Sequence, residues 1–157
     1  MSLVNRILTY ALGLFLISSG VAKFTVGHVF QYIEYQSGLD VFYPYVNNAT
    51  GVAEIAVGLL ILIPRTRLVG ATGAAAILAG AVAFHLSPWL GVSMPTGLVD
   101  GAAAPWTEAD FATTTTSVTF VLAIVTLIRS VTIIQTERRA RAHSADDIAV
   151  AAEPARV

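Results

Sequence analysis

Four long apolar stretches, separated by shorter polar or irregular segments, dominate the first 136 residues. They run approximately over residues 7–26, 46–63, 68–89 and 111–134. Each stretch has about 18 or more residues, which at ~1.5 Å of rise per helical residue is enough to cross the hydrocarbon core of a bilayer. The pattern therefore predicts an all-α fold: a polytopic membrane protein built as an antiparallel four-transmembrane-helix bundle.

The second and third stretches are joined by Pro64-Arg65-Thr66-Arg67. Proline cannot continue a helix without losing a backbone hydrogen bond, so the second helix should end there. A connection this short forces the two helices to be antiparallel neighbours.

Positively charged residues indicate the orientation, because they accumulate in short cytoplasmic segments of membrane proteins. Only Lys23 falls toward the other side of a four-span arrangement. The remaining positive residues all share one side: Arg6, Arg65, Arg67, Arg129, Arg138, Arg139, Arg141 and Arg156. We therefore expect a multi-pass protein of the cell membrane with both termini in the cytoplasm, and with segments 27–45 and 90–110 outside.

The chain after residue 136 is polar and rich in alanine, and it shows no apolar period that could be buried. This composition is typical of disorder. We expect one transmembrane domain over residues 1–136, followed by a disordered cytoplasmic tail over residues 137–157.

The first outer segment is rich in aromatic residues, which favour the headgroup zone of a bilayer. One interpretation is an interfacial belt. The other is a lid over an outward-facing pocket, formed by a short amphipathic helix that lies along the interface with Phe30 and Ile33 facing the bundle.

Small residues indicate how the helices pack. The third stretch contains Gly73 and Gly80, and the second contains Gly51 and Gly58 at a spacing of seven. In lipid, small side chains allow close approach of helix backbones, which replaces the hydrophobic driving force available in water. We therefore expect these four glycines at helix–helix contacts.

Composition excludes several functional classes. Hydrophobic residues make up 55% of the chain and charged residues only 12%, against roughly 25% in an average soluble domain. The net charge of -1, with no basic stripe, argues against nucleic acid as a partner. The absence of cysteine removes disulfides, dithiol relays and thiolate metal sites.

Three ionisable residues lie inside three different apolar stretches: Lys23, Glu54 and His85. The predicted topology places all three in the outer half of the bilayer. An ionisable group in a membrane span is costly, so it usually faces the bundle interior, pairs with a partner and marks function. We expect Glu54 to lie within hydrogen-bonding or ion-pair distance of Lys23, His85 or both.

Each member of this cluster also has a structural explanation. Lys23 can extend to the outer headgroups, and His85 can be a neutral imidazole bonded to a backbone carbonyl near Pro88. A Lys23–Glu54 ion pair can serve only to fix the packing of two helices. The functional alternative is an outward-opening polar pocket, in which Glu54 and His85 exchange protons with a ligand.

Phe30 and Trp89 join Glu54 and His85 in the predicted binding site for a quinone or another lipid-soluble ligand. Lys23, Glu54 and His85 are the candidate catalytic residues. We expect no intrinsic cofactor and no metal site, because His28, His85 and His143 fall in different regions of the chain.

Several segments together resemble the DoxX-like family of small four-helix membrane proteins. The resemblance covers about residues 5–134 and rests on Leu16 to Phe24 (LISSGVAKF), Gly51 to Leu60 (GVAEIAVGLL), Ile63 to Arg67 (IPRTR) and His85-Leu86. It implies a four-helix bundle with cytoplasmic termini, in a family linked to quinone-coupled sulfur oxidation, membrane-bound redox complexes and receptor assembly. The family's Lys, Glu and His positions would correspond to Lys23, Glu54 and His85, whereas the cysteine-dependent thiol chemistry of some relatives has no counterpart here.

Two functions stay open at this point. The first is a quinone-associated or accessory subunit of a membrane redox complex, without a redox centre of its own. The second is a non-catalytic scaffold or assembly factor for a larger membrane complex. Either function implies the lipid bilayer as surroundings, and other membrane subunits or further copies of the chain as partners.

Overall fold

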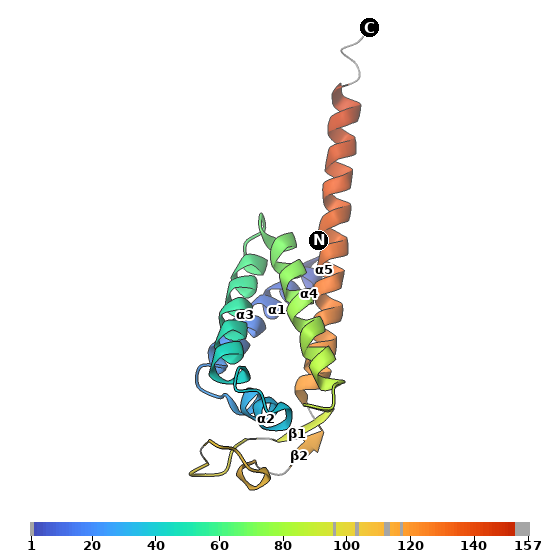
Figure 1. Cartoon of the computed structure of the whole chain (residues 1–157). Helices are drawn as coiled ribbons and strands as arrows, with labels where there is room; N and C mark the ends of the chain where they lie inside the picture. The colour runs from blue at the N-terminus through green and yellow to red at the C-terminus, as the bar shows by residue number, and fades with distance from the viewer. Residues whose placement is uncertain (1, 96, 103, 112–113, 117, 153–157) are drawn as a thin grey trace.

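The computed structural model describes residues 2–152, except residues 96, 103, 112–113 and 117. Four long helices form the body of the molecule (Figure 1): α1 (Leu3–Ala22), α3 (Asn47–Leu62), α4 (Arg67–His85) and α5 (Val118–Ala152). Each of the four is long and apolar enough to cross a membrane, α3 together with the turn before it as the span Phe42–Leu62. The predicted all-α four-helix bundle is therefore confirmed.

Shorter elements lie at one end of this bundle. They are the helix α2 (His28–Ser37), the irregular helical turn η1 (Phe42–Val46), the short helix η2 (Glu108–Asp110), and the strands β1 (Ser93–Pro95) and β2 (Thr114–Thr116). The two strands pair antiparallel, with Met94 opposite Thr115. We call this end of the bundle the capped end.

Glycines bring α1 and α3 together in antiparallel orientation. A Cβ atom on Gly20 would lie 2.6 Å from the carbonyl oxygen of Gly51, and one on Gly58 would lie 2.7 Å from that of Gly13. Both distances are shorter than any real contact of a Cβ atom, so only glycine permits this backbone approach. The predicted contacts of Gly51 and Gly58 are confirmed.

The two glycines of α4 differ. A Cβ atom on Gly73 would lie 2.7 Å from Val57 of α3, which confirms its predicted place at a helix contact. The prediction for Gly80 is wrong, because no heavy atom would lie within 4 Å of its Cβ. Gly80 instead lines a cavity described below.

The connection between α3 and α4 is as tight as predicted. Thr66 donates a hydrogen bond from Oγ1 to the carbonyl oxygen of Leu60, and Arg67 Nε donates to that of Ile61. These side chains satisfy carbonyl groups that the end of α3 leaves without helical partners.

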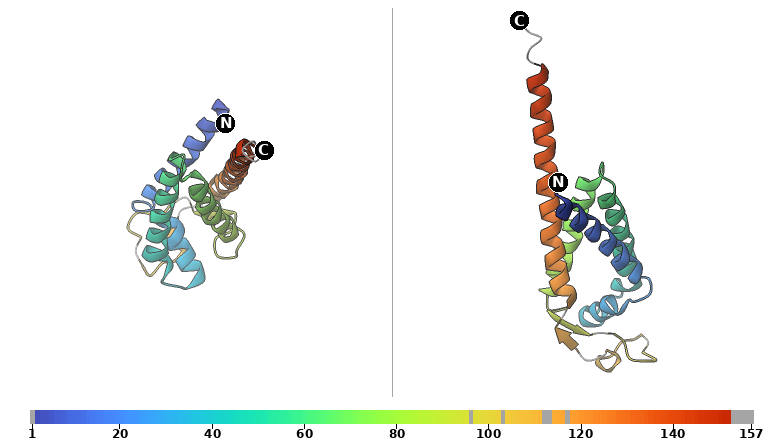
Figure 2. Two further views of the ribbon diagram at one scale, coloured as in Figure 1. Left: turned by 90° about the horizontal axis from the view of Figure 1, so that it is seen from above. Right: turned by 180° about the vertical axis from the view of Figure 1, so that it is seen from behind.

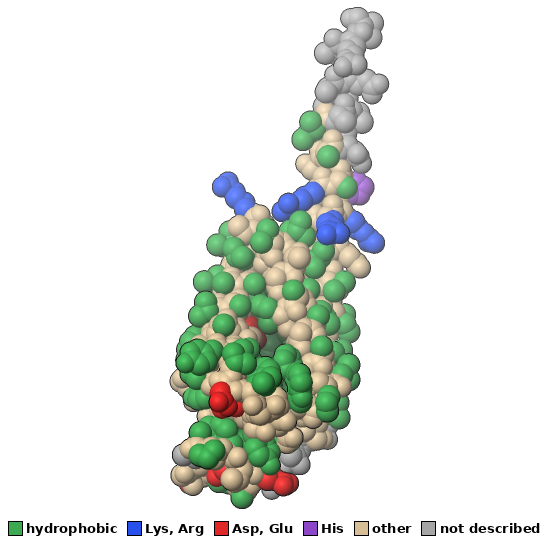
Figure 3. Space-filling view, viewed as in Figure 1, with side chains coloured by type: hydrophobic (Ala, Val, Ile, Leu, Met, Phe, Trp, Pro, Cys, Tyr) green, Lys and Arg blue, Asp and Glu red, His purple; other side chains and the backbone are tan. Residues whose placement is uncertain are grey.

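Arginines gather at the end of the bundle opposite the capped end, which we call the arginine end (Figure 3). Arg67 lies 3.5 Å from Glu137, the residue before Arg138 on α5. Arg129 donates hydrogen bonds to the backbone oxygen of Asn5 and to Thr9 on α1. The predicted placement of Arg65 and Arg67 on the side of Arg6 and Arg138 agrees with these contacts.

The main apolar core fills the bundle toward the arginine end. It contains Leu12, Leu16, Ile61, Ala71, Ala74, Leu78 and Ile133. Many other apolar side chains face outward, and Val52, Val69 and Ile128 are each more than half exposed. Outward-facing apolar residues on long helices are expected where lipid, rather than water, surrounds the protein.

The fourth span begins later than the sequence predicted. α5 starts at Val118 instead of residue 111, and Thr114–Thr116 form β2. Phe111 packs against Tyr32 and Tyr35 of α2, with ring centroids 5.1 and 5.5 Å apart. The apolar character of Phe111 therefore reflects packing at the capped end rather than membership of a span.

Residues 137–152 continue α5 as a helix, whereas the sequence pattern favoured a disordered tail. Alanine, arginine and glutamate all favour helix, and extending an existing helix needs no new nucleation. At 35 residues, or ~52 Å, α5 is longer than the bundle and projects beyond its arginine end (Figure 1).

α2 lies across the capped end of the bundle (Figures 1 and 2). Its Ile33 is only 2% exposed and packs with Phe42 and Leu90. Phe30 and Ile33 both line the cavity that is described below. The predicted short helix with Phe30 and Ile33 facing the bundle is thus confirmed. We call α2 the lid, because it covers the cavity at the capped end.

Candidate functional site

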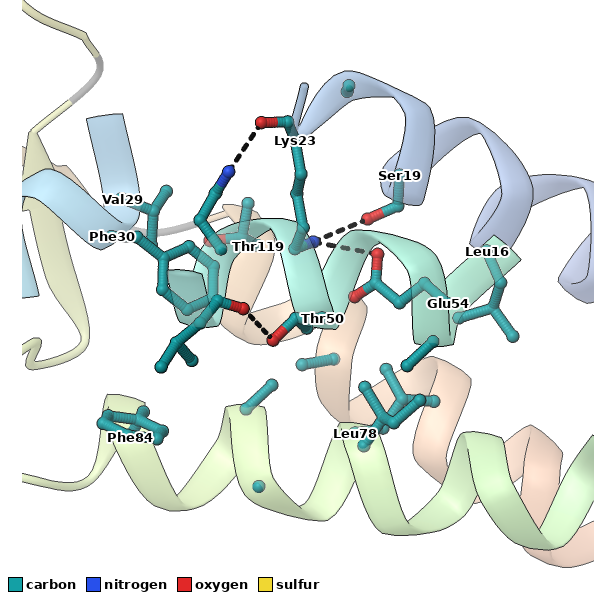
Figure 4. A pocket seen from close by; sticks show the side chains of 18 of the residues that line it. Leu16, Ser19, Lys23, Val29, Phe30, Thr50, Glu54, Leu78, Phe84 and Thr119 are labelled. Atoms are coloured by element: carbon teal, nitrogen blue, oxygen red, sulfur yellow. Dashed lines mark hydrogen bonds and ion pairs between the residues drawn. The ribbon is translucent and has the colours of Figure 1, made fainter. Parts of the chain in front are cut away.

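An ion pair links α1 to α3 inside the bundle (Figure 4). Lys23 Nζ, at the end of α1, lies 2.8 Å from Glu54 Oε2 and 3.4 Å from Ser19 Oγ. The side chains of Lys23 and Glu54 are 18% and 9% exposed. The predicted pairing of Glu54 is confirmed for Lys23.

The glycine contacts explain why this pair can form. Gly20 and Gly51 each lie three residues before a member of the pair, and their backbones touch. The close approach of α1 and α3 brings the short Glu54 side chain within reach of the Lys23 ammonium. Glu54 turns one oxygen to that ammonium and the other toward the cavity (Figure 4).

His85, at the end of α4, belongs to the same region but is not the partner of Glu54 in any contact of the described residues. Its Nδ1 lies 2.8 Å from the carbonyl oxygen of Gly91, and its Nε2 lies 3.5 Å from Thr119 Oγ1 on α5. A carbonyl oxygen can only accept, so Nδ1 carries a hydrogen and donates it to Gly91. The predicted bond between His85 and a backbone carbonyl is therefore confirmed, with Gly91 as the partner.

A cavity of about 630 Å³ lies between the helices and beneath α2. Most of its wall is apolar, and all three ionisable residues of the predicted cluster line it. Small residues of α4 open the space, namely Ala76, Gly80 and Ala81. The volume is within the range of sites for small organic ligands.

Two predicted ligand-binding aromatics have different positions. Phe30 lines the cavity. Trp89 does not, because α4 ends at His85 and the chain turns there. The Trp89 ring instead packs against Phe42 and Phe84 and is 41% exposed.

The cavity is also lined by polar residues that sequence reasoning did not select, among them Asn47, Thr50 and Thr119. Asn47 is 1% exposed and donates from Nδ2 to the carbonyl oxygen of Lys23 at 2.7 Å. This bond holds the end of α1 against the start of α3. Asn47 could have been selected from the sequence because it is an amide side chain in the first turn of an apolar helix.

α1 and α5 form two sides of the cavity. They meet near the arginine end, where Arg129 binds Asn5 and Thr9, and they diverge toward the capped end (Figure 2). Ser19 and Lys23 on α1, and Thr119 and Ala123 on α5, line the space between them. The cavity therefore lies toward the capped end, where α1 and α5 have separated.

Among the described residues, no group of three or more His, Asp and Glu side chains is placed to hold a metal ion. His28 lies apart from the cavity cluster, at the start of α2. Burial lowers the pKa of His28, which favours its neutral form.

Comparison with known proteins gives one match. No curated protein and no solved structure matches the chain. A family model described as a domain of unknown function, DUF8561, matches residues 12–104. The matched segment includes Lys23, Glu54 and His85 and covers more than half of the chain, so the protein belongs to the DUF8561 family.

Proposed function

We propose that this protein is a DoxX-like integral membrane protein that binds a quinone headgroup, or a related lipid-soluble ring, as an accessory subunit of a membrane redox complex. The observation that carries the proposal is the cavity of about 630 Å³, whose mostly apolar wall includes the Lys23–Glu54 pair and the His85 ring. Such a site can enclose a ring and offer hydrogen bonds at one edge of it.

The three polar side chains can move protons but not electrons. Glu54 and the Nε2 atom of His85 can each accept a proton from a ligand, and the Lys23 ammonium stabilises negative charge beside Glu54. Electrons would be delivered or taken up by a partner subunit, since redox steps on a ring need a second redox group.

The divergence of α1 and α5 supports entry of a ligand from the bilayer. A ring carrying a long apolar tail could place its headgroup beside Lys23 while the tail passes between the two helices into lipid. The exposed apolar residues along this side, among them Phe15 and Leu122, suit such a tail.

The orientation is part of the proposal. The arginine end would face the cytoplasm, because positive residues accumulate there in membrane proteins. Both termini would then be cytoplasmic, and the cavity and its lid would lie in the outer half of the cell membrane.

Titration of the purified protein with a short-chain benzoquinone tests the proposal. We expect saturable binding, weakened by about tenfold or more in the combined variant Glu54→Gln, His85→Ala, because one hydrogen bond to a charged group contributes ~1.5–3 kcal/mol. Glu108→Gln, an exposed position outside the cavity, is the matched control. Absence of binding, or binding unaffected by the combined variant, would contradict the proposal.

The second candidate function is a scaffold or assembly factor, favoured by the projection of α5 beyond the bundle. This part of α5 includes Arg138, Arg139 and Arg141, all exposed. Purification from native membranes distinguishes the two: a stable partner that is lost on truncation after residue 136, without effect on quinone binding, would favour the scaffold.

A further inference from the structure

The polar face of the cavity has hydrogen-bond acceptors without donors. Glu54 Oε2 accepts from Lys23, but Oε1 accepts no hydrogen bond from the described part of the chain. Asn47 Oδ1 is buried and likewise has no partner there. Glu54 Oε1 faces the cavity, so a ligand or water that donates to it is favoured, whereas Asn47 Oδ1 is enclosed by protein atoms.

The donors on the same face are largely occupied. Both hydrogens of the Asn47 amide are used, since Nδ2 contacts the carbonyl oxygen of Lys23 and Asn48 Oδ1. Thr50 Oγ1 donates to the carbonyl oxygen of Val46 at 2.7 Å.

Further donors of the cavity belong to His85, Lys23 and Ser19. The hydrogen on His85 Nδ1 is directed to Gly91. The Lys23 ammonium has three N–H groups, of which two point to Glu54 and Ser19 and one remains. Ser19 Oγ accepts from Lys23, and its own O–H donates to no partner in the described part of the chain, so it is a second donor. The face thus offers two donors next to the Glu54 carboxylate and its open Oε1 atom.

A hydroxyl group matches this arrangement better than a carbonyl group. A hydroxyl can donate to Glu54 Oε1 while its oxygen accepts from the third N–H of Lys23. A carbonyl oxygen can accept from Lys23 but places its lone pairs beside the carboxylate, which is electrostatically unfavourable.

We infer that the cavity selects ligands that bear a ring hydroxyl, and so prefers the reduced quinol to the oxidised quinone. This inference rests on the proposed function, because it names the redox form that the same site binds.

The test compares three compounds with the same ring and tail in the purified wild-type protein, under anaerobic conditions: a short-chain benzoquinol, its benzoquinone, and the quinol with both hydroxyls methylated. Isothermal titration calorimetry gives the three dissociation constants. We expect the quinol to bind about tenfold or more tightly than either other compound, the effect of one hydrogen bond to a charged acceptor.

The variant Glu54→Gln provides a second measurement, because its amide can present an N–H where the carboxylate had only acceptors. We expect the preference for quinol to fall to within about twofold, from one lost charged hydrogen bond. Glu108→Gln should keep the wild-type preference. The comparison in the wild-type protein stands even if Glu54→Gln fails to fold.

Equal binding of quinol and quinone, or tighter binding of quinone, would overturn the selectivity and leave the proposed quinone site intact. Equal binding of the methylated compound and the quinol would also overturn it, since affinity would then be purely apolar. If none of the three compounds binds, the proposed function fails together with this inference.

Discussion

At the residue scale, the Lys23–Glu54 pair is the feature that joins structure to function. Its two charges lie largely away from solvent, 2.8 Å apart, on different helices. Removal of one side chain leaves the other as an unpaired, desolvated charge, which destabilises the fold. Replacement of both by apolar side chains leaves no unpaired charge and is therefore less destabilising. The pair therefore contributes to packing whether or not the cavity binds a ligand.

We predict that Glu54→Ala lowers the free energy of unfolding in detergent by about 3–5 kcal/mol, because it strands the Lys23 ammonium. The double variant Lys23→Met, Glu54→Leu should be closer to the wild type than the summed losses of Lys23→Met alone and Glu54→Leu alone. The measurement is a double-mutant cycle by chemical denaturation, with Glu108→Ala as an exposed control expected to change stability by less than ~0.5 kcal/mol. Additive losses would show that the two side chains do not interact.

At the element scale, α1 and α3 depend on glycine, whereas α4 uses glycine in two ways. Gly73 packs against Val57, and Gly80 opens space beside the cavity. The sequence predicted the first role for both because small residues allow close approach of helix backbones in lipid. The direction in which each position faces depends on how α4 and α3 separate toward the capped end, which spacing alone does not determine.

Substitution of these glycines should separate the two roles. Gly20→Ala places a Cβ atom 2.6 Å from the carbonyl oxygen of Gly51, so we predict a loss of about 1–3 kcal/mol by forced separation of α1 and α3. Gly80→Ala meets nothing within 4 Å, and it should be neutral or stabilise α4 by up to ~1 kcal/mol. Thermal unfolding in detergent measures both changes, and a larger loss for Gly80→Ala than for Gly20→Ala would contradict this packing.

Helix number and the placing of Lys23, Glu54 and His85 around one cavity could be predicted from sequence, because a span of fixed length limits where each residue can lie. The pairing of Glu54 followed from the same limit. The ends of the spans were less predictable. Phe111 is as apolar as a span residue yet packs on α2, and Trp89 lies beyond the turn after His85. Both errors arise because packing between elements at the capped end uses apolar side chains, as a membrane span does, so the sequence pattern does not distinguish the two.

At the scale of the whole molecule, charge and cavity lie at opposite ends. The arginine end carries Arg65 and Arg67, while the lid and the strands close the capped end (Figures 1 and 3). Because the cavity lies away from the arginine end, the side of the membrane that the arginine end faces also determines which leaflet surrounds the cavity.

The chain has no cysteine, so single introduced cysteines report the orientation without background. We predict that Asp100→Cys, in the capped-end loop, reacts with a membrane-impermeant maleimide in intact cells. Arg65→Cys, exposed at the arginine end, should react only after permeabilisation, since positive segments are retained in the cytoplasm. The opposite pattern would invert the topology and place the cavity in the inner leaflet.

The central claim is that the cavity holds a lipid-soluble ring, and extraction of ligands from the purified protein tests it most directly. We predict that wild-type protein isolated from native membranes in mild detergent carries an isoprenoid quinone or quinol, detected by mass spectrometry of the organic extract. Gly80→Trp should remove it by filling the cavity, whereas Val69→Trp, facing outward on the same helix, should retain it. Wild-type protein without such a compound, or equal amounts in wild type and Gly80→Trp, would contradict the account.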